Sequence, residues 1–277
     1  MNGAAMPADA ELVDLLSDVW ASMADLGEGL TEGDWKTPTD VPGWSVQDNL
    51  VHITSMEWHL LGRPLPEHTL PDALPHVKNE IGRANELFVD SRRALTGAEA
   101  LAEFREVIEA RLQQLRDYGP DDFAAESWTP VGPGTVRDLL PFRVFDSWVH
   151  EQDMRRAVGR PGDLDGAVAE SATARMVASM PFIVGKRVGA RDGTTVHFGI
   201  SGPSARTFTI VVDGGRARFA EELTGAPTAT IATDGETFVR LTCGRVDPAE
   251  ALGSDRVHLG GDTDLGRRVV EELNFLF

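Results

Sequence analysis

The spacing of apolar residues changes once along this chain of 277 residues, near the segment Gly159-Arg160-Pro161-Gly162-Asp163. Before this segment, apolar residues recur every three to four positions, which is typical of amphipathic helices. After about Ala190 they form short runs separated by glycines, which is typical of strands. A chain of this length can form one large domain or two ordinary ones. We therefore expect two domains, residues 1–160 and residues 161–277.

The first of these domains is expected to be helical. Ser45 with Asp48, and Thr135 with Asp138, form capping boxes that predict two helix starts. Pro141 either kinks the last helix or marks the start of its regular part. The apolar spacing predicts helices over residues 9–30, 45–61, 77–95, 99–117 and 135–158. We expect an up-and-down four-helix bundle with the N-terminal helix included.

The second domain is expected to combine helices with a sheet. Asp213-Gly214-Gly215 has the composition of a hairpin turn. Strands are predicted over residues 194–200, 206–213, 217–220, 229–233 and 257–259, and helices over 165–188, 235–241, 248–252 and 262–273. The whole chain is therefore expected to be α+β, with a helical bundle followed by a smaller α+β domain that has an antiparallel sheet.

Charge and cysteine content exclude several classes of partner. The formal net charge is −18, which argues against nucleic acid and against an anionic membrane surface as partners, since binding either one needs basic residues on the protein.

No apolar run approaches the roughly 20 residues that span a bilayer. The first 19 residues lack the pattern of a signal peptide. The single cysteine, Cys243, forms no internal disulfide and is expected to be structural. We expect a cytoplasmic protein, either a monomer or a homodimer.

Two histidines occur in matching helical settings. His52 ends the segment Pro42-Gly43-Trp44-Ser45-Val46-Gln47-Asp48-Asn49-Leu50-Val51-His52, and His150 follows Asp146 by four residues. Residues four apart stack on one helix face. Asp146, His150 and one imidazole from a neighbouring helix would provide three metal ligands and leave one position open, as in catalytic metal sites.

Other interpretations of these residues remain open. Arg143, Asp146, Ser147 and His150 form a polar wedge on an otherwise apolar helix, and such a wedge faces either solvent or a polar cavity. His52 alone could be a boundary residue bonded to backbone or water. His59 is two turns from His52, about 10 Å along the axis, so both do not easily bind one metal. The sequence contains no P-loop, G-x-G-x-x-G, H-E-x-x-H or G-x-S-x-G motif.

Two segments resemble a known family. Thr37-Pro38-Thr39…Pro42-Gly43-Trp44-Ser45-Val46…Leu50-Val51-His52 and Trp148-Val149-His150-Glu151-Gln152-Asp153-Met154-Arg155-Arg156-Ala157-Val158-Gly159 are similar to the mycothiol-dependent maleylpyruvate isomerase family. That resemblance implies a DinB-like metal-binding bundle and a C-terminal domain with the sterol-carrier-protein-2 (SCP2) fold. The family's ligands are a histidine from the second helix and a Glu-x-x-x-His pair from the fourth. They correspond to His52, Asp146 and His150, with aspartate in place of glutamate.

The resemblance also implies a function. Family members use zinc or a similar divalent ion to activate the thiol of a small cofactor, mycothiol, against a small electrophilic substrate. The reaction is then an isomerisation or an S-transfer. Arg143, Arg240 or Arg245 could bind a substrate carboxylate. Two alternatives remain: a non-catalytic protein that binds a small ligand, and another metal-assisted reaction, hydrolytic or biosynthetic, on the same scaffold.

Overall fold

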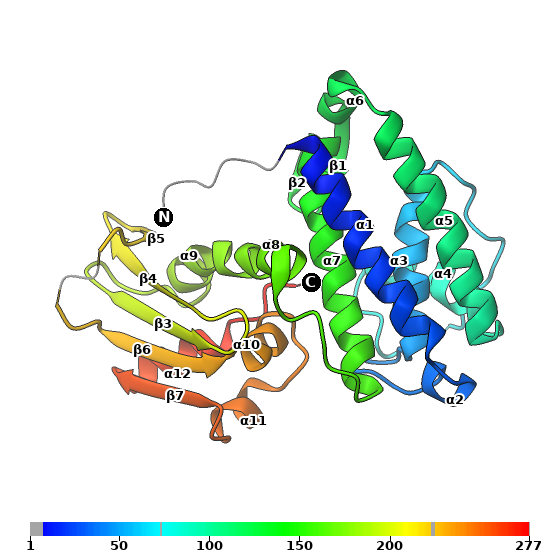
Figure 1. Cartoon of the computed structure of the whole chain (residues 1–277). Coiled ribbons are helices and arrows are strands. Elements are labelled where there is room, and N and C mark those ends of the chain that lie inside the picture. The colour runs from blue at the N-terminus through cyan, green and yellow to red at the C-terminus, as the bar shows by residue number, and fades with distance from the viewer. Residues whose placement is uncertain (1–7, 73, 223–224, 277) are drawn as a thin grey trace. The chain divides into compact units, whose positions relative to one another are not determined.

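The computed structural model describes residues 8–276 except 73 and 223–224. They divide into two compact units, with the division after Asp163 (Figure 1). Each unit has its own core. Within the described residues, no helix combines the length and the apolar character that crossing a membrane requires.

The first unit is a helical bundle. Helix α1 packs on α5 and α7, and α3 packs on the same two helices, while α4 packs on α3. The five expected helices are present, with ends that differ by a few residues from the predicted ones. The elements are α1 (Asp9–Glu28), α2 (Glu32–Trp35), α3 (Val46–Leu60), α4 (Glu80–Arg92), α5 (Gly97–Asp117), α6 (Pro120–Ala124), β1 (Glu126–Thr129), β2 (Gly132–Thr135) and α7 (Val136–Ala157).

Both predicted capping boxes are present and define the starts of the two helices that matter for the site. The Ser45 hydroxyl accepts from the Asp48 amide, and the Asp48 carboxylate accepts from the Ser45 amide at 2.8 Å. Thr135 and Asp138 make the same pair before α7. Helix α7 continues through Pro141, so its regular part does not begin there. Pro141 lacks an amide donor, so the helix loses one backbone hydrogen bond there, while the residues of the other turns keep theirs.

The second unit consists of a five-stranded sheet with helices. The strand order is β5-β4-β3-β6-β7, and the α+β class is confirmed. Three of the pairings are antiparallel, whereas β3 and β6 are parallel. The elements are α8 (Gly166–Ala178), α9 (Met180–Phe182), the π-helical turn η1 (Ile183–Arg187), β3 (Thr195–Ser201), β4 (Arg206–Asp213), β5 (Arg216–Phe219), β6 (Ala229–Asp234), α10 (Gly235–Thr242), α11 (Pro248–Leu252), β7 (Val257–Gly261) and α12 (Thr263–Glu271).

Two features of this unit correct the sequence analysis. The helix expected over residues 165–188 is divided into α8, α9 and η1, because Pro181 lacks an amide donor and restricts the preceding residue. The parallel β3–β6 pair arises because the chain leaves β5 at one edge of the sheet and re-enters beside β3 on its other side. Strand periodicity identifies strands but does not determine their order.

The carboxyl group of Glu151, on α7, is buried among polar side chains of the first unit. Glu151 is 1% exposed and accepts from Arg155 Nε at 2.8 Å and from the Ser22 hydroxyl. Arg155 also pairs with Asp163, the last residue of the unit. Burial raises the pKa of Glu151 to about 7, although Ser22 and Arg155 act to lower it.

The stability of the first unit should therefore depend on pH through the Glu151 carboxyl group. A carboxyl with a raised pKa in the folded state contributes stability below its unfolded pKa of 4.5, and that contribution is lost as the pH rises through about 7. Glu151→Gln does not titrate. Its free energy of unfolding relative to the unmodified protein should rise by about 2 kcal/mol between about pH 5 and pH 8. Urea unfolding at both pH values measures this, and a difference that does not change with pH contradicts it.

Candidate metal centre

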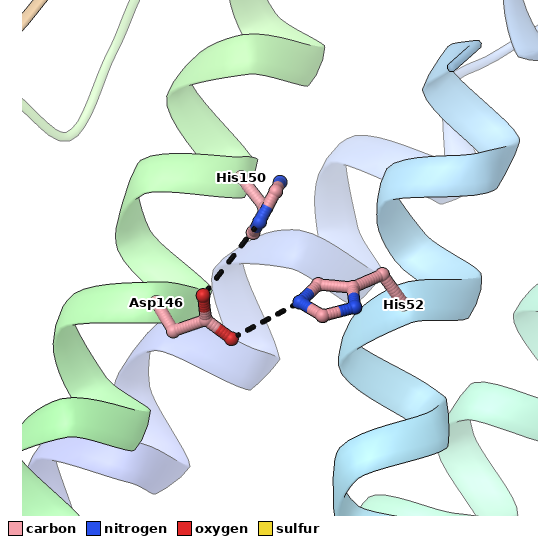
Figure 2. A group of neighbouring side chains, drawn as sticks. All are labelled: His52, Asp146 and His150. Atoms are coloured by element: carbon pink, nitrogen blue, oxygen red, sulfur yellow. Dashed lines mark ion pairs between the residues drawn. The ribbon is translucent and has the colours of Figure 1, made fainter. Parts of the chain in front are cut away.

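The structure brings the predicted ligand residues together. His52 comes from α3, whereas Asp146 and His150 come from α7, and each offers one ligand atom within 4.8 Å of the other two. His52 Nε2 lies 3.3 Å from Asp146 Oδ2, and His150 Nε2 lies 3.6 Å from Asp146 Oδ1. Figure 2 shows both imidazoles directed at the Asp146 carboxylate. Within the described residues, no other group of three histidine, cysteine or acidic residues has this arrangement.

The two separations of 3.3 and 3.6 Å are close to those between neighbouring ligands of one metal ion. Ligands at about 2.0–2.1 Å from a tetrahedral zinc ion lie roughly 3.3 Å apart. The two histidines are 5% and 6% exposed, so their ring nitrogens are largely removed from water. The Asp146 side chain is 30% exposed, so the group is accessible from the side of the carboxylate. Nitrogen and oxygen donors with one accessible side suit a divalent ion that keeps an open position.

A hydrogen bond to Asn49 fixes the tautomer of His150. The Asn49 amide nitrogen donates to the Ser45 carbonyl at 2.8 Å and to the Thr39 hydroxyl at 3.0 Å. Its carbonyl oxygen therefore faces His150 Nδ1, at 2.6 Å. An amide oxygen only accepts, so Nδ1 must carry the hydrogen. In the neutral ring, Nε2 then presents its lone pair towards Asp146, as a metal ligand would.

His52 and His150 share an aromatic wall. The Trp44 ring lies 5.1 Å from the His52 ring and 5.8 Å from the His150 ring, measured between centroids, and the two imidazoles are 4.7 Å apart. The indole nitrogen donates to Glu86 Oε2 at 2.8 Å. The nitrogen of His52 that faces Asp146 is Nε2. The other ring nitrogen, Nδ1, is buried without a hydrogen-bond partner among the described residues.

Arg143, predicted as a candidate for binding substrate, lies at this group and is held by carboxylates. Its side chain is 3% exposed, with Nε donating to Glu57 at 2.7 Å and Nη1 donating to Asp146 Oδ2 at 2.6 Å. Burial alone would raise the pKa of Asp146, but the neighbouring positive charge, above all that of the Arg143 guanidinium, outweighs it and holds that pKa well below the usual value. Asp146 is therefore an anion, the form that binds a metal.

The other predicted residues lie elsewhere. Arg240, on α10, and Arg245 are in the second unit, where Arg245 donates to the Cys243 carbonyl at 2.8 Å. Their role in substrate binding stays a prediction. Cys243 is 1% exposed. His59 is exposed.

Three polar residues that contact the group or its neighbours were not predicted as part of a site from the sequence: Asn49, Glu57 and Glu86. Asn49 and Glu57 lie three residues before and five residues after His52 on α3, so a search for polar residues near this histidine would have included both. Nothing in the local sequence distinguishes them from solvent-facing residues. Their partners come from other helices and loops of the unit.

The fold and this group of candidate ligands define a helical bundle with a candidate metal centre, joined to an α+β domain. Residues 16–155 match the model of the mycothiol maleylpyruvate isomerase N-terminal domain, and residues 184–273 match the SCP-2 sterol transfer family. The chain therefore belongs to the mycothiol-dependent maleylpyruvate isomerase family. The family membership that the sequence resemblance implied is confirmed.

Solved structures support the fold assignment. A crystal structure of a mycothiol-dependent maleylpyruvate isomerase is 16% identical, with a TM-score of 0.57, over 92% of this chain and 93% of that one. A histidine-to-alanine variant of a mycothiol-dependent maleylpyruvate isomerase aligns over the same shares, with 16% identity and a TM-score of 0.55. At this identity the likeness shows the fold alone. No curated protein matches significantly.

Proposed function

We propose that this protein is a metal-dependent enzyme that uses a small thiol, mycothiol, to isomerise a small electrophilic substrate or to attach the thiol to it through its sulfur. The observation that carries the proposal is the convergence of His52, Asp146 and His150 on one point in a chain of this family. The solved relative is named as a mycothiol-dependent maleylpyruvate isomerase.

Zinc is the ion that we propose for the centre, held by His52 Nε2, His150 Nε2 and one oxygen of Asp146. A divalent ion lowers the pKa of a coordinating thiol, so that the thiolate is present at neutral pH. Two neutral imidazoles and one carboxylate would leave a net charge of +1 with the ion. That charge favours an anionic sulfur at the open position.

Two of the proposed ligand residues have separate tasks in this scheme. His150 is oriented by Asn49 and offers a lone pair, and Asp146 supplies the negative charge. The Trp44 ring lies against both histidines, and we expect it to exclude water from that side. Excluding water strengthens the electrostatic interactions within such a site.

The thiolate acts as a nucleophile in both reaction types. Its sulfur forms a bond to one carbon of an electron-poor double bond, and the electron pair of that double bond moves onto the conjugated carbonyl oxygen. In an isomerase, the remaining single bond rotates, the carbon–sulfur bond breaks and the double bond re-forms, so the thiol is regenerated. In a transferase, the adduct takes up a proton and leaves.

A second candidate function is the binding of a small ligand without catalysis. The match of residues 184–273 to the SCP-2 sterol transfer family favours it. Turnover that requires both metal and thiol supports the enzyme, whereas binding of a small apolar ligand with no thiol-dependent turnover supports the second candidate.

Substitution of Asp146 tests the metal centre directly. Asp146→Asn removes the charge at constant size and should raise the dissociation constant for Zn²⁺ about 100-fold. Asp146→Glu keeps a carboxylate and should retain the ion within about tenfold, with turnover changed through geometry. Chelator competition measures both constants. Turnover that is indifferent to chelation, to thiol removal and to Asp146→Asn contradicts the proposal.

Trp44 offers an optical test of the same centre, because its ring contacts both histidines. Co²⁺ bound between them should quench Trp44 fluorescence, and Trp44→Phe should remove most of the Co²⁺-dependent decrease. Trp128→Phe, at an exposed position on β1, serves as the control and should leave the decrease unchanged. Equal quenching in the unmodified protein and in both variants places the ion elsewhere.

A further inference from the structure

A buried array of charges lies behind Asp146. Glu57 on α3, Arg111 on α5 and Arg143 on α7 are 1%, 2% and 3% exposed. Glu57 Oε1 accepts from Arg143 Nε at 2.7 Å, and Glu57 Oε2 accepts from Arg111 Nε at 3.3 Å. Arg143 then extends the array to Asp146 Oδ2, at 2.6 Å. The two arginines and two carboxylates balance in charge.

Stability alone does not account for this array. A buried ion pair often stabilises a fold no better than apolar side chains of similar volume. Arg143 also leaves Nη2 buried without a hydrogen-bond partner among the described residues, which costs free energy. The array therefore holds the charged guanidinium of Arg143 in a fixed position beside Asp146.

Arg143 reaches Asp146 with a fixed direction. Its guanidinium is planar, so the bond from Nε to Glu57 also determines where Nη1 points. Asp146 is the most exposed of the three ligand residues, with 30% of its side chain accessible, and it therefore has the most freedom to turn towards solvent. The bond to Nη1 restrains that freedom, because it holds Oδ2 in place beside His52 Nε2, 3.3 Å away, while Oδ1 faces His150.

We infer that Arg143, held by Glu57, is a positioning residue that orients Asp146 as a ligand of a divalent cation. The inference rests on the proposed function only in assuming that the centre binds metal. Outer partners of metal ligands commonly change metal affinity about 10- to 100-fold when they are removed. The Glu57–Arg143 pair has for Asp146 the role that Asn49 has for His150.

A double-mutant cycle with Zn²⁺ tests the inference on the full chain. Arg143→Lys keeps the charge but loses the planar fork, and it should raise the Zn²⁺ dissociation constant about 10- to 100-fold. If Arg143 acts through Asp146, the same substitution in an Asp146→Asn background should change the constant less than about threefold. Arg137→Lys is the matched control on α7, because it alters an Arg–Asp pair, with Asp9, outside the centre.

Two further measurements separate positioning from folding. The absorption spectrum of bound Co²⁺ reports ligand geometry and should change in Arg143→Lys but not in Arg137→Lys. Thermal unfolding of the metal-free proteins reports stability. If Arg143→Lys does not fold, the cycle is run with Arg143→Met, which leaves Glu57 paired with Arg111.

An effect of equal size in both backgrounds overturns the inference, and so does an unchanged or tighter dissociation constant in folded Arg143→Lys. A native protein that binds no Zn²⁺ overturns both this inference and the proposed function. If the cycle behaves as expected but turnover needs no thiol, the proposed function fails and the positioning role stands.

Discussion

Replacing His150 with alanine should abolish Zn²⁺ binding and reduce thiol-dependent turnover by about a thousandfold or more, while the bundle remains folded. Two protein ligands hold a catalytic ion poorly, because a stable site needs at least three. The packing of α7 depends on other side chains of the same helix, including Val144, Trp148 and Met154, which are at most 1% exposed. Metal analysis, turnover and circular dichroism measure the three effects.

His59→Ala is the matched control for this substitution. His59 lies on α3, as His52 does, but it is exposed and is not part of the ligand group. The control should keep its full metal content. A His150→Ala protein that binds Zn²⁺ as tightly as the unmodified protein would show that the ion, if bound, is held elsewhere.

The candidate ligand group was predictable from the sequence in part, because the placement of each residue on its own helix depends on local geometry. Asp146 and His150 are four residues apart on a helix whose start is set by a capping box, so their shared face follows from the helix repeat. His52 has the same kind of local evidence, because the Ser45–Asp48 box fixes the start of α3. Helix periodicity alone does not show that the two faces meet. The family resemblance supplied that step.

The surroundings of the group were not predictable, because they depend on contacts between distant segments. Asn49 meets His150 across 101 positions and Glu57 meets Arg143 across 86. Local periodicity does not distinguish such buried polar residues from solvent-facing ones, since both interrupt an apolar stripe. The same limit applies to the hairpin of β1 and β2, where Pro130 and Pro133 hide the strand pattern.

The buried position of Glu57 also has a consequence for stability. Glu57 accepts from Arg143 and Arg111, and all three side chains are at most 3% exposed. Removing one member of a buried ion pair leaves its partner charged in a medium that solvates charge poorly. The cost of breaking such a pair is about 3–5 kcal/mol. Removing Glu57 deprives two arginines of one shared partner, although Arg143 keeps Asp146 and Arg111 keeps Gln114.

Glu57→Ala should therefore lower the free energy of unfolding of the first unit by about 3–5 kcal/mol and its melting temperature by roughly 10 °C. Urea and thermal unfolding of the metal-free protein measure both. Glu106→Ala is the control, because Glu106 pairs with Arg63 at the surface, where its side chain is 59% exposed. An exposed pair contributes at most about 1 kcal/mol. If the two substitutions cost the same, the two buried arginines do not depend on Glu57 for charge compensation, and the fixed direction of Arg143 towards Asp146 needs another cause.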